Sequence, residues 1–234
     1  MKRRTFVKGA AALPAVAALG LKDAGAVGDL QPIDLPKPKT DGGLPVMAAL
    51  KARKTTRTIT SDPLPLPTLS NLLWAAYGVN RVEMGLMGKR GRTAPSASNS
   101  QEIDLYVCLV DGVYLYEAGP HRLAPIAAGD FRGRAGRQPG MGKAPVTIFY
   151  VVDTTKYIVG KGQPDPHIGE PEVQKSYYFA DTGFIAQNVY LFAASEGLAA
   201  WFHNVDRENT RKDFRLRPEQ KALFGQSVGY PAKS

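Results

Sequence analysis

The sequence predicts an α+β fold in which helices flank a central, mostly antiparallel sheet. Two β-forming segments, Glu102–Val110 and Gly112–Glu117, meet at Asp111-Gly112, a dipeptide that favours a tight β-hairpin. A third segment, at 144–153, is apolar at most positions, as expected for a strand covered on both faces. A long apolar helical pattern at 177–196 can cover such a sheet.

The size and composition are those of a globular chain with one domain. Its 234 residues are 44% hydrophobic and 22% charged, which suffices for one well-filled core. The formal net charge is +9, but residues 1–26 hold five positive charges and one negative, which leaves 25 positive and 20 negative charges elsewhere. Outside 89–92 and 132–137 the remaining basic residues are scattered, so we expect no nucleic-acid partner.

Residues 1–26 have the pattern of a twin-arginine signal peptide. Arg3-Arg4 opens the segment, residues 9–21 are weakly apolar, and Ala24-Gly25-Ala26 has the form of a cleavage site. The apolar stretch is shorter than the roughly 20 residues that span a bilayer, so we expect no stable membrane span. The prediction is a periplasmic or otherwise exported protein, with an uncleaved membrane anchor as the alternative.

An extended leader, two helices and a loop are expected before the first strand. Residues 27–44 carry three prolines and three glycines and predict an extended leader before the domain at 45–234. Helical patterns cover 45–53 and 66–78, and the glycine-containing residues 79–94 are expected to form a loop.

The second half is expected to hold a cover, a long helix and a last strand. Residues 157–176 are rich in Gly and Pro and predict a mobile cover over a site. The helix at 177–196 is closed by Gly197. Short helical pieces are expected at 210–214 and 216–221, and a final strand at 226–230.

Two polar stretches are candidate binding segments. Arg53 and Arg57 leave the first helix on a loop, and guanidinium groups suit a phosphate because they pair with it bidentately, while Thr55 adds a hydroxyl. The run from Pro95 to Gln101 offers many side-chain donors and acceptors to a planar polar edge. The alternatives are an exposed basic loop for the first stretch and an ordinary turn for the second.

Taken in order, Arg-x-Thr-x-Arg, Pro-Ser-Ala-Ser-Asn-Ser-Gln, the helix that includes Gln187-Asn188 and the final Val-Gly-Tyr-Pro resemble the nitroreductase family of FMN enzymes, over roughly residues 44 to 233. Within that family, Leu-Leu-Trp-Ala-Ala-x-Gly at 72–78 and Gly-x-Tyr-x-Tyr at 112–116, followed by His-x-Leu at 121–123, resemble the SagB-type thiazoline/oxazoline dehydrogenase branch. The resemblance implies a nitroreductase-like fold and an intertwined homodimer with FMN between its subunits.

The resemblance also implies roles for particular residues. Arg53, Thr55, Arg57 and Lys233 would hold the FMN phosphate from one chain. Five consecutive residues of the other chain would face the flavin ring: Pro95, Ser96, Ala97, Ser98 and Asn99. Asn204 and Val205 occupy the place of a segment whose backbone N–H groups face the flavin.

Lys156-Tyr157 resembles the Leu-Lys-Tyr motif of the thiazoline dehydrogenases, which is credited with removing a substrate proton. Thr155 replaces the leucine here. A desolvated lysine, or a tyrosine beside a cation, could serve as that base. A surface lysine at the end of a strand is the alternative.

The function that these features predict is an FMN-dependent oxidoreductase of SagB type, which transfers hydride between a small or peptide-borne substrate and flavin N5. Outside the cytoplasm NAD(P)H is not expected, so the electron donor or acceptor is left open. An NAD(P)H-dependent nitroreductase and a non-catalytic flavin-binding redox module are the alternatives. We expect no metal, because no second ligand stands at metal-binding spacing around His121.

Overall fold

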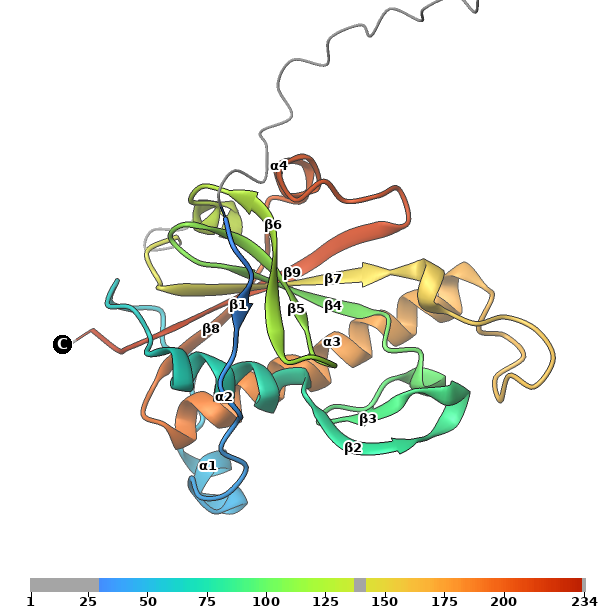
Figure 1. Cartoon of the computed structure of the whole chain (residues 1–234), viewed down its shortest axis with the longest axis horizontal. Helices are drawn as coiled ribbons and strands as arrows, with labels where there is room; N and C mark the ends of the chain where they lie inside the picture. Colours follow the sequence, from blue (N-terminus) through green and yellow to red (C-terminus); the bar gives the residue numbers. More distant parts are fainter. Residues whose placement is uncertain (1–29, 137–141, 233–234) are drawn as a thin grey trace, which may run out of the picture.

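The computed structural model describes residues 30–136 and 142–232, and it contains a seven-stranded sheet between helices (Figure 1). The strand order is β1-β6-β5-β4-β7-β9-β8, and every pairing along it is antiparallel. The predicted α+β fold with a central antiparallel sheet is therefore confirmed. The predicted signal peptide and Lys233 lie outside the described residues.

The predicted hairpin forms one half of the sheet. β4 (Ile103–Cys108) pairs with β5 (Gly112–Glu117), and β5 pairs with β6 (Arg122–Ala128). β1 (Ile33–Asp34) adds a two-residue strand at the outer edge, against the start of β6. Part of the predicted leader therefore belongs to the sheet.

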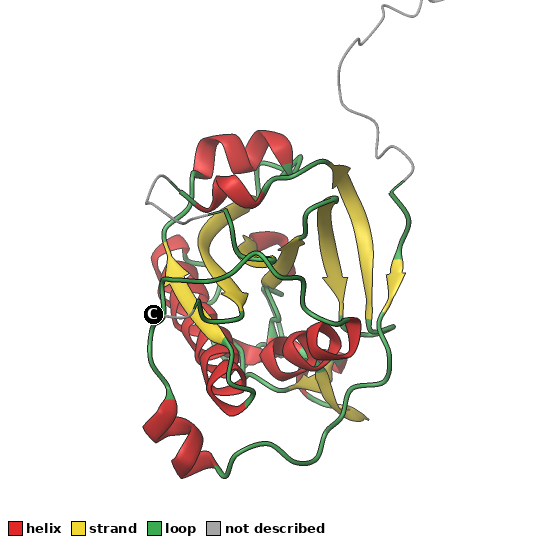
Figure 2. Ribbon diagram, turned by 90° about the vertical axis from the view of Figure 1, so that its left-hand side faces the viewer, coloured by secondary structure: helices red, strands yellow, loops and turns green. Residues whose placement is uncertain are grey.

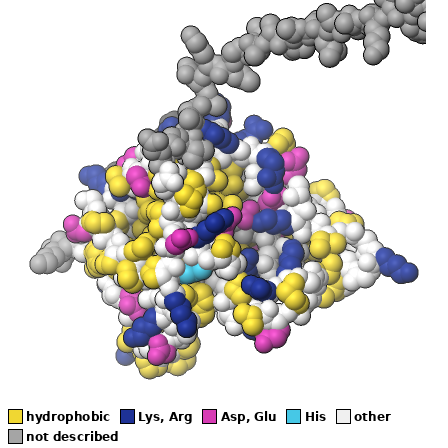
Figure 3. All heavy atoms as spheres, viewed as in Figure 1, with side chains coloured by type: hydrophobic (Ala, Val, Ile, Leu, Met, Phe, Trp, Pro, Cys, Tyr) yellow, Lys and Arg dark blue, Asp and Glu magenta, His cyan; other side chains and the backbone are white. Residues whose placement is uncertain are grey.

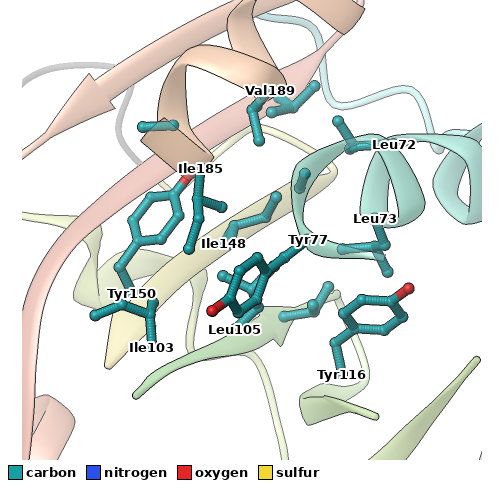
Figure 4. Packing of buried hydrophobic residues seen from close by; sticks show 14 of the residues in the cluster. Leu72, Leu73, Tyr77, Ile103, Leu105, Tyr116, Ile148, Tyr150, Ile185 and Val189 are labelled. Carbon is teal, nitrogen blue, oxygen red and sulfur yellow. The ribbon is translucent and has the colours of Figure 1, made fainter. Parts of the chain in front are cut away.

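β7 (Val146–Asp153) is the central strand that the sequence predicts. It lies between β4 and β9, and all eight of its residues are buried. Ile148 and Tyr150 face a core made with two helices, and Figure 4 shows them packed near Ile185 and Leu72. Phe149 faces a second core on the opposite side of the sheet. The alternation along the strand thus gives the sheet two covered faces.

Among the described residues there are four α-helices, and three of them lie on the faces of the sheet (Figures 1 and 2). α2 (Leu66–Tyr77) and α3 (Pro171–Ser195) lie on the larger core, and α4 (Arg207–Asp213) lies across the sheet from them. α1 (Val46–Ala52) packs beside α3. Short 3-10 turns complete the chain at Leu86–Gly88, Ala97–Asn99, Arg132–Ala135 and Thr154–Lys156.

Two predictions were wrong: the start of the long helix α3, and the loop predicted at 79–94. α3 begins at Pro171, six residues before the predicted start, because proline fits the first helical turn, where its missing N–H is not needed. Residues 79–94 are not a plain loop, since β2 (Val79–Met84) and β3 (Arg90–Arg92) form a separate hairpin.

The last strand is also longer than predicted. β9 (Gln220–Gly229) begins six residues early and includes the end of the predicted helical piece at 216–221. It pairs with β7 on one side and with β8 (Ala199–His203) on the other. The residues of the early start, 220–224, pair with β7 alone, and this pairing supplies hydrogen bonds that local helical preference does not outweigh.

Cys108 and His121 both have structural roles. Cys108 is buried in the sheet, and burial raises the pKa of its thiol well above the usual value. His121 is hydrogen-bonded on both ring nitrogens, to Ser70 at 2.7 Å and to Tyr116 at 2.9 Å. Among the described helices none is long and apolar enough to cross a bilayer.

Candidate functional site

The basic run after α1 lies against the start of β8 and against the end of the described chain. The N–H of Thr56 donates to the carbonyl of Ala200 at 3.0 Å, and the N–H of Ala232 donates to the carbonyl of Thr58 at 3.0 Å. Ile59 forms a β-bridge with Pro231. The structure thus brings the predicted Arg-x-Thr-x-Arg run beside Gly-Tyr-Pro, as the phosphate prediction requires.

The two arginines of this run stack on aromatic rings and keep their hydrogen-bond donors free. The guanidinium carbon of Arg53 lies 5.4 Å from the centre of the Tyr190 ring, and that of Arg57 lies 5.7 Å from the Trp201 ring. Within the described part of the chain, neither guanidinium forms a hydrogen bond or an ion pair. The ring contact holds each guanidinium in place while its N–H groups can still meet an anion, so each arginine is able to bind a phosphate.

Tyr190 of α3 organises the run, and the sequence analysis missed it. Its hydroxyl oxygen accepts the N–H of Phe202 at 2.8 Å and lies 3.0 Å from the hydroxyl of Thr55, to which it is hydrogen-bonded. One side chain therefore joins α3, β8 and the run. The only sequence signal was a tyrosine on a largely apolar helix, where a buried hydroxyl usually needs a partner.

The Pro95–Asn99 segment is a strained turn that uses many of its own polar groups. Ser98 and Asn99 have φ of 49° and 52°, in the left-handed region that non-glycine residues seldom adopt. The Asn99 amide donates to the carbonyls of Leu86 and Lys89 at 2.8 and 3.2 Å. The oxygen of its amide accepts from Gln101 at 2.9 Å. The turn therefore holds its shape without a ligand.

Other groups of the turn remain available or bind to the core. The N–H of Ala97 donates to Asp181 of α3 at 2.9 Å, and the hydroxyl of Ser96 accepts the N–H of Gln101 at 3.0 Å. The Ser98 hydroxyl has no partner among the described residues. Of the predicted contacts to a planar ring, the Ser98 hydroxyl is thus the side-chain group best placed to supply one.

A cavity of about 450 Å³ separates this turn from the β2–β3 hairpin. The walls include three basic side chains, Arg81, Lys89 and Arg92, and one acidic side chain, Glu83. Several Lys and Arg side chains are visible on this face of the molecule in Figure 3. The cavity is therefore electropositive beside the turn.

Lys156 and Tyr157 follow β7, where the carboxylate of Asp153 accepts the N–H of Thr155 at 3.1 Å. Lys156 Nζ pairs with Asp104 Oδ1 at 2.5 Å. The Tyr157 hydroxyl donates to the carbonyl of Gln174 at 3.3 Å. Burial, and then the carboxyl of Glu102, raise the pKa of Tyr157 far above the usual value. At neutral pH Tyr157 is thus a neutral hydrogen-bond donor, and Lys156 is held by a carboxylate.

Asn204 and Val205 follow β8. Asn204 is exposed, and Val205 is buried in the second core. Along an extended chain Asn204 lies about 13 Å from Ala200, where the basic run attaches. Their predicted backbone contacts to a flavin stay a prediction. In the described ranges no three His, Cys, Asp or Glu side chains gather as a metal site.

The nitroreductase family model matches residues 50–230, so the chain belongs to the nitroreductase family, a family of flavin-binding oxidoreductases. A protein of Methanocaldococcus jannaschii that is named as a nitroreductase is 29% identical over 201 residues, which are 78% of this chain and 90% of that protein.

Solved structures show the same fold. A protein of Ralstonia eutropha JMP134 described as a nitroreductase has a TM-score of 0.77 and 34% identity, over 97% of this chain and 98% of that one. The NADPH:FMN oxidoreductase of Vibrio harveyi has a TM-score of 0.54 and 17% identity, over 80% of this chain and 69% of that one. The predicted fold and the predicted class of enzyme are therefore confirmed.

Proposed function

We propose that this nitroreductase-family oxidoreductase binds FMN and acts as a SagB-type dehydrogenase or oxidase on a small or peptide-borne substrate. One observation carries the cofactor assignment. Arg53 and Arg57 each present a guanidinium with free donors on an aromatic support, in the run that the family motif assigns to the phosphate. An anion with two charges matches such a pair better than a neutral ligand does.

Bound FMN would supply the acceptor for a hydride at its N5 atom. The chain's own residues would then bind, orient and exclude water. Arg53, Arg57 and Lys233 would hold the phosphate, and the Pro95–Asn99 turn would cover the ring. Thr55 would keep the run in place through Tyr190, which differs from the direct phosphate contact that the sequence suggested.

A homodimer would unite the two halves of this site. Within one chain the turn attaches to α3 at Asp181 and the basic run attaches at Tyr190. Nine residues are two and a half helical turns, so these side chains leave α3 on opposite faces. One ligand that meets both sets therefore fits best between two chains.

Exposed apolar side chains also favour a second copy of the chain. Val46 and Met47 of α1 are 70% and 76% exposed, and Phe184 of α3 is 48% exposed. A helix that presents large apolar residues outward is typical of an interface. Sedimentation of the purified protein should therefore give a dimer mass.

The branch within the family rests on the motifs at 72–78 and 112–123 and on Lys156-Tyr157. In this proposal the neutral Tyr157 hydroxyl donates a hydrogen bond in the site, and Lys156 stays paired with Asp104 until a substrate arrives. If the signal peptide exports the protein, a quinone, a protein carrier or oxygen would replace NAD(P)H as the electron partner.

The test is an absorbance scan of the purified chain, with and without added FMN. The proposal expects two visible flavin bands and retention of FMN through gel filtration. Arg57→Ala should weaken retention by about 1.5 to 3 kcal/mol, because a charge-assisted hydrogen bond is lost. Arg211→Ala is the matched control, since Arg211 is exposed on α4, outside the run. Colourless protein that takes up no FMN would refute the proposal.

A nicotinamide-driven nitroreductase is the second candidate, because the M. jannaschii and R. eutropha relatives are named as nitroreductases. Anaerobic mixing of the loaded protein with NADH or NADPH separates the two. Bleaching of the flavin bands within seconds supports the nitroreductase, and bands that persist support the dehydrogenase.

A further inference from the structure

Two acidic side chains lie buried beneath the Pro95–Asn99 turn. Glu102 directly precedes β4 and is fully buried, and Asp181 of α3 is 3% exposed. Within the described chain, neither carboxyl oxygen of Glu102 meets an N–H or O–H donor in hydrogen-bond geometry. Buried polar groups without a partner are rare in folded proteins, so this one needs an explanation.

The two carboxyl groups interact with each other and with the candidate site. Asp181 accepts the N–H of Ala97 at 2.9 Å, which makes it the link between α3 and the turn. The Glu102 carboxyl interacts with that of Asp181 and with the Tyr157 hydroxyl. The pair is therefore bonded to the predicted ring-facing turn through Asp181, and the Glu102 carboxyl lies close enough to the predicted catalytic tyrosine to raise its pKa.

The charged and titratable groups around the pair do not neutralise it. From α2, the Tyr77 hydroxyl is buried without a partner. From the β3 side, Lys89 Nζ donates to the carbonyl of Ser100, and Arg92 stacks on the Tyr77 ring at 5.0 Å and donates to Gln101. No ion pair joins either cation to Glu102 or Asp181 among the described residues.

A proton is then the remaining means of satisfying two facing carboxyl groups in a buried space. Burial first, and then the charge of Asp181, raise the pKa of Glu102 above its usual range. Burial also raises the pKa of Asp181. With one proton on the pair, the Glu102 O–H can donate to Asp181 while Asp181 still accepts from Ala97.

We propose that Glu102 and Asp181 are positioning residues that share one proton, and that this proton holds the Pro95–Asn99 turn on α3. Loss of the proton leaves two facing negative charges, and their repulsion weakens the packing of the turn on Asp181, although the Asp181 carboxylate can still accept the N–H of Ala97. The consequence for flavin binding rests on the proposed function, whereas the shared proton does not.

The first test measures the unfolding equilibrium of the flavin-free protein between pH 5 and 8. Because the folded state retains a proton that the unfolded state releases, stability falls as the pH rises, and the unfolding constant increases by up to tenfold per pH unit. Glu102→Gln should remove this slope, since its amide can donate to Asp181 without titrating. Glu172→Gln is the control, because Glu172 is exposed on α3, the helix that carries Asp181. An equal slope in Glu102→Gln would overturn the proposal.

A second measurement does not depend on a variant that folds. In wild-type protein labelled with 13C at the side-chain carboxyls, one resonance at pH 6.5 should have the shift of a protonated acid. If every carboxyl resonance is ionised at that pH, the proposal is wrong.

Flavin retention then links the proton to the site. Retention of FMN by the wild type should weaken by up to tenfold per pH unit above the pKa of the pair, and Glu102→Gln should show no such loss. Protein that binds no FMN would refute the proposed function and leave the slope as a test of the shared proton. Protein that binds FMN with the same pH dependence in both forms would refute this inference alone.

Discussion

The basic run at 53–57 and the turn at 95–99 differ in how they satisfy their own polar groups. Arg53 and Arg57 stack on rings and leave their N–H groups without hydrogen bonds in the described chain. In the turn, by contrast, polar groups are already hydrogen-bonded: the Asn99 side-chain amide alone takes part in three hydrogen bonds, with Leu86, Lys89 and Gln101. The first region is open to an anion, and the second is a preformed surface.

This difference indicates which region would supply the binding energy for a ligand and which would supply a surface of fixed shape. A phosphate can gain charge-assisted bonds from the run, which has donors to spare. A ring that lies on the turn would gain mainly a flat, fixed neighbour, because few donors remain there apart from the Ser98 hydroxyl. Substitutions in the run should therefore lower FMN affinity more than stability, and substitutions in the turn should lower stability more than FMN affinity.

The largest effect is expected from removing both arginines of the run. The variant Arg53→Ala/Arg57→Ala should weaken FMN retention by about 3 to 6 kcal/mol if the two contributions add. Its free energy of unfolding without FMN should change little, because neither guanidinium makes a polar contact in the described chain. Equilibrium dialysis and urea unfolding measure the two quantities. A large loss of flavin-free stability would contradict the comparison.

A substitution in the turn should show the reverse proportion. Asn99→Ala removes three hydrogen bonds and leaves alanine at a positive φ, so we expect a loss of about 2 to 4 kcal/mol in the free energy of unfolding. Asn99→Gly loses the same bonds without the strain and should cost about 1 kcal/mol less. Asn80→Ala, at an exposed position of β2, is the control in urea unfolding. Equal stability of the alanine and glycine variants would show that φ imposes no strain.

Tyr190→Phe should sharpen the comparison, because this residue supports the run without touching the ligand. The loss of the hydroxyl leaves the Phe202 N–H and Thr55 without their partner, at a cost of about 1 to 2 kcal/mol in stability. FMN retention should fall less than in Arg57→Ala. Tyr177→Phe, whose hydroxyl binds Asp165, serves as the control. If retention falls as much as in Arg57→Ala, Tyr190 does more than position the run.

The smallest effect on stability is expected for Lys156→Met. Its pair with Asp104 is partly exposed, so the loss should be within about 1 kcal/mol. Thermal unfolding should therefore change slightly, while turnover of a substrate falls steeply if Lys156 acts in proton removal. Lys175→Met, from an exposed pair with Glu172, is the control for the loss of a charge. Unchanged turnover would leave Lys156 as a surface residue that terminates a strand.

Sequence patterns correctly predicted those elements in which the local preference of the residues matches the structure that tertiary packing imposes. Asp111-Gly112 favours a hairpin wherever it occurs, and the strand at 146–153 is apolar on both sides because both faces are covered. The start of β9 was wrong because residues 216–221 have no strand-like alternation, and only pairing with β7 makes 220 and 221 extended. The β2–β3 hairpin was missed because its residues are mostly exposed and leave no hydrophobic pattern.

The parts of the candidate site that could be predicted are those in which the residue types of a short motif indicate what it can bind. The run at 53–57 and the segment at 229–231 were named from the sequence, and the structure brings them together. Tyr190 and the pair of Glu102 and Asp181 were not, because their roles depend on partners far away in the chain. A single tyrosine or carboxylate in an apolar segment does not reveal what it meets after folding.

The two-residue strand β1 has a consequence for how the protein tolerates shortening at its amino end. It covers only the start of β6, and Leu35 beyond it is buried in the main core. A polypeptide that begins at residue 45 would leave the edge strand β6 unpaired on its outer side. Unpaired edge strands can form hydrogen bonds with strands of neighbouring molecules. Residues 30–44 include the strand that covers this edge, and cleavage after residue 26 would leave them in place.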